Sequence, residues 1–98
     1  MRVVVHAGGV RLDDPADCRR FHIVHSGPVA LDAALRTAGA GYADGMEAMI
    51  DVSWLRSQAH DRVGADWPAD FAAMLEYAAT KGWLSADRGH VRAHVEAA

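Results

Sequence analysis

The clearest alternation of hydrophobic and polar positions lies in the closing segment of the chain. Within residues 90–96, Val91, Ala93 and Val95 are separated by polar residues at every intervening position. This period of two is typical of a β-strand with one apolar and one polar face. A helix would place the two valines on different faces, so we predict a strand over residues 90–96.

Four other segments predict strands. Residues 2–6 carry three consecutive valines, and residues 21–25 form a second stretch of aromatic and β-branched residues. Such residues favour strands, and the glycines and proline that follow each stretch are expected to end it. We expect these two segments to pair as an N-terminal hairpin. Residues 47–50 and 83–86 predict two shorter strands.

Three segments have the spacing of amphipathic helices: residues 29–38, residues 52–61 and residues 67–81. In the last of them, Pro68 suits a first helical turn and Gly82 suits the end of a helix. Its apolar stripe comprises Trp67, Phe71, Met74, Leu75 and Ala78. This segment is the best specified helix of the chain.

These elements predict one α+β domain over residues 1–98. We expect a single antiparallel sheet of the five strands, with the three helices on one of its faces. An alternative is a winged helix with an extra N-terminal hairpin, because the order of elements after residue 29 matches that fold. Its third helix would be residues 68–81 and its wing residues 83–96.

Charge disfavours the DNA-binding role that a winged helix would suggest. Residues 52–96 contain five basic and six acidic side chains, and the whole chain has a formal net charge of −3. A DNA-reading helix needs Arg, Lys, Asn or Gln in its first turns, where this chain has Asp70. We therefore expect no binding to nucleic acid or to an anionic membrane surface.

Composition is that of an ordinary globular domain, with 51% hydrophobic and 23% charged residues. No apolar run approaches the roughly 20 residues of a membrane-spanning helix, and the three-valine run near the start is too short for a secretory signal. The single cysteine, Cys18, excludes an intrachain disulfide. We expect a cytoplasmic protein.

Cys18 lies beside Arg19 and Arg20, whose charges could lower the thiol pKa and make it a nucleophile. Free cysteine is more often a small packing residue, and we favour that role here.

The candidate polar site consists of histidines and two charged residues of the predicted strands. On residues 90–96, the polar side chains share one face, and His22 or His25 could join them if residues 21–25 lie alongside. The candidate residues are His22, His25, His90, Arg92, His94 and Glu96. Imidazoles with a carboxylate suit zinc, nickel, copper or general-base chemistry. Polar strand faces usually meet only water, so we assign no metal and no cofactor.

The function that we expect is a non-enzymatic binding or protein-interaction module, with no identified small-molecule ligand. We also expect a homodimer, formed through an exposed sheet edge or an apolar patch. A small histidine-based enzyme or metal-binding protein is the alternative, and a winged-helix regulator is the second alternative.

The C-terminal half, through residues 70–78, 81–84 and 92–96, resembles small uncharacterised proteins of GC-rich bacteria. The similarity covers about two-thirds of the chain. It implies a bacterial source and draws attention to the pair His94 and Glu96, but it brings no activity, cofactor or catalytic residue.

Overall fold

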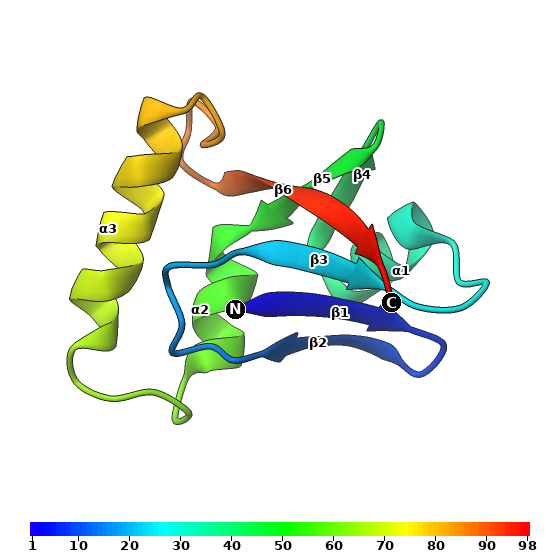
Figure 1. The fold of residues 1–98 in the computed structure, drawn as a ribbon, viewed down its shortest axis with the longest axis horizontal. Coiled ribbons are helices and arrows are strands. Elements are labelled where there is room, and N and C mark those ends of the chain that lie inside the picture. Colours follow the sequence, from blue (N-terminus) through cyan, green and yellow to red (C-terminus); the bar gives the residue numbers. More distant parts are fainter.

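The computed structural model describes residues 1–98, which form six strands and three helices (Figure 1). The strands are β1 (Arg2–His6), β2 (Gly9–Asp13), β3 (His22–His25), β4 (Gly41–Asp44), β5 (Glu47–Asp51) and β6 (His90–Ala97). The helices are α1 (Leu31–Ala38), α2 (Val52–Ala59) and α3 (Trp67–Thr80). All strands belong to one sheet, in the order β2-β1-β3-β6-β5-β4. The α+β class is thus confirmed, and none of the three helices has the length and hydropathy of a membrane span.

The prediction of a purely antiparallel sheet is wrong. β1 pairs in parallel with β3, and β3 pairs in parallel with β6, while the other three pairings are antiparallel. The reason is β2, a strand that the sequence did not predict. β2 takes the hairpin position beside β1, and residues 14–21 then carry the chain back so that β3 runs in the direction of β1.

Two other strand predictions also need correction. Residues 83–86 form only an isolated bridge, between Leu84 and Val91. Conversely, β4 forms between the predicted helix 29–38 and the predicted strand 47–50, where the sequence predicted no strand. Gly41 has a φ of 145°, and a Cβ atom there would lie 1.9 Å from the backbone oxygen of Met49. The glycine thus permits a close strand pairing rather than marking a loop.

The three helices appear where their apolar spacing predicts them. α2 begins after Asp51, whose side chain accepts a hydrogen bond from the backbone N–H of Trp54 at 2.8 Å. This contact satisfies one of the free N–H groups of the first helical turn. The winged-helix alternative is not supported, because β6 lies between β3 and β5 inside the sheet rather than in a free wing.

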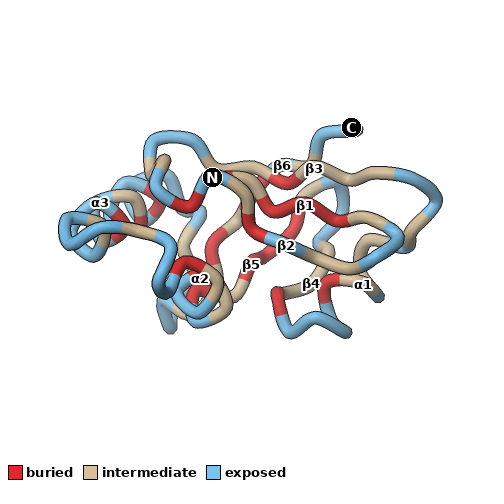
Figure 2. The backbone as a smooth tube through the Cα atoms, turned by 90° about the horizontal axis from the view of Figure 1, so that it is seen from below, coloured by how far each residue is buried: buried red, intermediate tan, exposed pale blue.

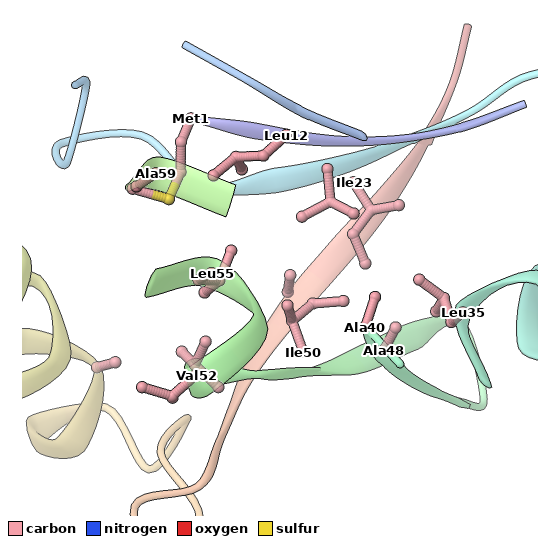
Figure 3. Packing of buried hydrophobic residues seen from close by; sticks show 14 of the residues in the cluster. Met1, Leu12, Ile23, Leu35, Ala40, Ala48, Ile50, Val52, Leu55 and Ala59 are labelled. Atoms are coloured by element: carbon pink, nitrogen blue, oxygen red, sulfur yellow. The ribbon is translucent and has the colours of Figure 1, made fainter. Parts of the chain in front are cut away.

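The sheet is curled around the hydrophobic core. Figure 2 shows α1 and α2 on its concave side, whereas α3 stands beside the end of the sheet where β1 and β6 begin. The expectation of three helices on one face is therefore correct for two of them. Figure 3 shows the core between the two halves of the curled sheet, where Ile23, Ile50 and Leu55 are fully buried. Phe71 of α3 belongs to the same cluster.

Both outer strands of the sheet are in contact with helices. β4 packs against α1, and the backbone N–H of Ala43 donates to the carboxylate of Asp32 at 2.9 Å. β2 is contacted by α1 and α2, and its Leu12 is only 1% exposed. Curling of the sheet thus covers edges that an open sheet would leave free.

Candidate functional site

The six predicted polar residues lie on two opposite faces of the sheet. Register places His22 on the same convex face as the polar side chains of β6, because Val24 pairs with Glu96. His25 is an odd number of residues away and points to the concave side, where its Nε2 lies 2.5 Å from the backbone oxygen of Val29. His25 therefore does not lie with the candidate residues on the convex face.

Three of the predicted residues meet on the convex face. The Nε2 atoms of His94 and His22 lie 3.1 Å and 3.4 Å from the two carboxylate oxygens of Glu96. The two imidazole rings stack with their centroids 5.7 Å apart. The hydrogen bond from His94, together with the charge of His22, holds the pKa of the Glu96 carboxyl below its ordinary value. The cluster is open to water, since the side chains of His94 and Glu96 are more than half exposed.

The remaining two predicted residues have other partners. Arg92 binds Asp44 at 2.8 Å and Glu47 at 3.3 Å, which joins β6 to the β4–β5 hairpin. His90 lies 3.9 Å from a carboxylate oxygen of Asp51. No group of three or more His, Cys, Asp or Glu side chains is arranged to hold a metal ion. The candidate residues thus make several separate polar contacts on the surface and do not meet in one common site.

A groove lies between α3, residues 16–21 and the first half of β6. Its volume is about 830 Å³. α3 contributes Asp70, Ala73, Met74, Tyr77 and Ala78, and the strand contributes Val91, Arg92, Ala93 and His94. Residues 16–19 with Phe21, and Glu47 and Trp83, complete the lining. We call this feature the α3–β6 groove.

The groove exists because α3 touches the sheet with one stripe only. Phe71, Leu75 and Ala78 are buried against the core, whereas Ala73 and Tyr77, on the adjoining flank of the helix, are exposed. Since residues at positions i, i+3, i+4 and i+7 share a helix face, the flank forms a continuous wall from Asp70 to Tyr77. The helix therefore leaves a hollow between itself and the sheet.

The floor of the groove is a stretch of β6 with a strand on one side only. β5 pairs with β6 along residues 90–94, but on the other side β3 begins to pair at Val95. Residues 83 and 84 also contact this side of β6. Leu84 forms a bridge with Val91, and the Arg92 N–H donates to the Trp83 oxygen, but these contacts do not reach Ala93. No strand lies beside Ala93 and His94 on the groove side, and of these two only His94 turns its backbone to that side, because Ala93 is paired with Ala48 of β5.

Two aromatic side chains at one end of the groove are exposed. Tyr77 is 58% and Trp83 is 42% exposed, and their rings meet edge to face at 6.0 Å. The other two tryptophans are partly buried and pack against the core. Trp67, for example, donates its indole N–H to the backbone oxygen of Pro15 at 2.7 Å. Of the three indoles, only that of Trp83 is exposed.

The opposite end of the groove contains Asp17, Cys18, Arg19 and Asp70. Burial, followed by the charge of Asp70, raises the pKa of the Cys18 thiol. The sequence-based possibility that neighbouring arginines lower this pKa is therefore wrong. The thiol is protonated at neutral pH, which agrees with a packing role and not with a nucleophile.

Sequence reasoning missed most of the groove. Of the predicted site residues, only Arg92 and His94 line it. One signal was present in α3, where the aromatic residue Tyr77 lies outside the predicted apolar stripe of the helix. Comparisons with protein-family models, curated proteins and solved structures give no match for this chain. Function is therefore inferred from the groove itself.

Proposed function

We propose that this chain is a protein-interaction module that binds a short segment of a partner protein in the α3–β6 groove. The observation that carries the proposal is the exposed pair Tyr77 and Trp83 beside a groove whose floor is a partly unpaired strand. Tyrosine and tryptophan are enriched among the residues that dominate binding energy at protein interfaces.

The dimensions of the groove support this role. Its volume of about 830 Å³ can hold several side chains but is small for a whole domain. The walls combine apolar groups, such as Phe21 and Met74, with polar groups at the ends. Apolar groups in the middle of such a groove provide binding energy, and polar groups at its ends orient the bound segment.

The unpaired stretch of β6 favours a segment in an extended conformation. Partner segments often add to a free strand edge through backbone hydrogen bonds, with side-chain pockets providing specificity. Here the available stretch is very short, because Ala93 directs its backbone groups to Ala48 of β5 and only His94 turns its backbone toward the groove. A segment that crosses β6 there can gain one or two backbone hydrogen bonds at most. Affinity must then come mainly from the aromatic end.

Binding is a better account of the groove than catalysis. Cys18, the only thiol, has a raised pKa and lies near the carboxylates of Asp17 and Asp70. His94, the only imidazole of the lining, is engaged by Glu96 in open solvent. No pair of groups in the groove has the contact between nucleophile and base that covalent catalysis requires.

The experiment compares two arginine substitutions on neighbouring exposed residues of α3. Ala73 lines the groove and Ala72 does not, although both are exposed alanines of the same helix. Peptides are first selected on the wild-type chain from a random-peptide phage library and then titrated by fluorescence anisotropy. We expect Ala73→Arg to weaken the selected peptides at least tenfold, because the side chain fills the groove, and Ala72→Arg to change affinity less than twofold.

Three outcomes would reject the proposal: a library that yields no binder, binders that tolerate Ala73→Arg, or binders equally affected by Ala72→Arg. Circular dichroism of both variants controls for folding. The homodimer expected from the sequence stays a prediction. If light scattering shows a dimer that Ala73→Arg dissociates, the groove serves self-association and the proposed binding of a separate partner segment is wrong.

A further inference from the structure

We propose that the partner segment carries an aromatic or long aliphatic anchor and, about three residues away, a lysine or arginine that binds Asp70 and Asp17. This inference rests on the proposed function and specifies the chemistry of the partner. It follows from the unequal ends of the α3–β6 groove.

The two ends of the groove are separated by a known length of helix. Asp70 and Tyr77 are seven residues apart on α3, which corresponds to about 10 Å at ~1.5 Å per residue. An extended segment rises ~3.3 Å per residue and covers the same distance in about three residues. An anchor beside Tyr77 and Trp83 therefore brings a side chain three positions away to the level of Asp70.

The acidic end has carboxylates that lack a side-chain partner. Asp70 forms no ion pair, and the Asp17 carboxylate accepts a hydrogen bond only from the backbone N–H of Arg19, at 3.1 Å. Glu47, the third carboxylate of the lining, is already bound by Arg92. A cation from a partner would thus find its main acceptor in Asp70, with Asp17 beside it as a second acceptor that also faces cations of the chain, and none at Glu47.

Cations of the chain itself act mainly on Asp17. The pKa of its carboxyl is held below the ordinary value by the Arg19 N–H and then by the charges of the Met1 amino group, Arg20 and Arg19. Arg19 lines the groove as well, and the amino group of Met1 lies 2.7 Å from the backbone oxygen of Asp17. The pKa of the Cys18 thiol depends on both the carboxylates and the cations at this end of the groove. Among the charges acting on its pKa, that of Asp70 is the strongest and raises it, ahead of the lowering by the amino group, and Asp17 raises it further. The field at Cys18 is therefore negative.

The aromatic end carries a positive charge, that of Lys81, and so determines which end of the groove can accept the cation of the segment. The Lys81 ammonium lies 5.5 Å from the centre of the Tyr77 ring, so a second cation there would meet a like charge. Acidic residues of the partner would in turn be disfavoured beside Asp70. The anchor and the cation thus each have one suitable end.

The test uses the peptides selected on the wild-type chain. We expect them to share an apolar anchor with Lys or Arg two to four positions away. Replacing that residue of the peptide by glutamine should weaken binding about three- to fivefold, as expected for a partly exposed ion pair. Asp70→Asn should weaken the original peptide to a similar extent and the glutamine peptide hardly at all.

Asp66→Asn is the matched control, because Asp66 lies at the same end of α3 and does not line the groove. It should leave both peptides within twofold. Asp17→Asn is the second variant, since an asparagine oxygen can still accept from the Arg19 N–H if loss of Asp70 perturbs the helix. Peptides that bind the groove without a basic residue, or a glutamine peptide that Asp70→Asn weakens as much as the original, would overturn this inference. Sensitivity to Ala73→Arg in the same peptides would show that the proposed function still holds.

Discussion

The carboxylate of Asp32 on α1 accepts a hydrogen bond from the backbone N–H of Ala43 on β4, and this contact helps to close the outer edge of the sheet. Asp32 also binds Arg36 one turn later on the helix, at 2.9 Å. A strand edge with free N–H groups invites pairing with another chain. The contact therefore contributes both to stability and to resistance against aggregation.

Asp32→Ala should lower the melting temperature at pH 7 and increase self-association on heating. The hydrogen bond from Ala43, and then that from Arg36, hold the pKa of the Asp32 carboxyl below its ordinary value. A lowered folded pKa means that the stabilisation is present above about pH 4 and is lost as pH falls through the folded pKa. The difference in melting temperature between wild type and variant should thus shrink on acidification. Thermal unfolding followed by circular dichroism from pH 7 to pH 3 measures it, and a constant difference would contradict this account.

Gly41→Ala should be among the most damaging single-methyl additions in the chain. Its φ of 145° costs about 1–3 kcal/mol for any other residue, and the new Cβ would collide with the Met49 carbonyl of the neighbouring strand. Gly64→Ala is the control, because a Cβ there meets nothing within 4 Å and no left-handed φ is involved. Urea unfolding should give a much lower midpoint for Gly41→Ala than for Gly64→Ala. Equal midpoints would show that β4 does not pair as described.

Phe71→Ala should loosen α3 and abolish the groove. The side chain is 1% exposed, stacks on Trp67 with ring centroids 4.6 Å apart, and belongs to the core cluster. We expect a loss of about 3–5 kcal/mol in the free energy of unfolding. Tyr77→Ala, on the exposed flank of the same helix, should cost less than about 1 kcal/mol while weakening selected peptides. Chemical denaturation measures both values, and the reverse order of stability would refute the assignment of the two faces.

Cys18 should react slowly with iodoacetamide at pH 8, because its raised pKa leaves little thiolate. Asp70→Asn removes a negative charge that raises this pKa, so the pKa should fall and alkylation should accelerate. Mass spectrometry of timed samples gives the rates. Asp66→Asn should leave the rate unchanged, and a slower rate in Asp70→Asn would show that the sign of the field at Cys18 is opposite to the one described. A bound peptide should protect the thiol.

Part of the candidate site was already determined by residue spacing. The polar face of β6 follows from its period of two, and the structure confirms that strand within one residue at its end. The same rule separates His22 from His25, since residues three apart on a strand point to opposite faces. Which strand lies beside β6 was not determined locally, and only the parallel register of β3 brings His22 to Glu96.

By itself, the sequence determined the elements whose signals are local: the valine strand β1, the alternating strand β6, and the stripe and end of α3. Tertiary structure alone decided the direction of β3, the pairing of β4 through Gly41, and the α3–β6 groove. The physical reason is the distance along the chain over which each interaction acts. Backbone preference and side-chain period act within a few residues, whereas strand direction, the termination of pairing at Ala93 and His94, and the stance of α3 depend on contacts between residues far apart in the chain.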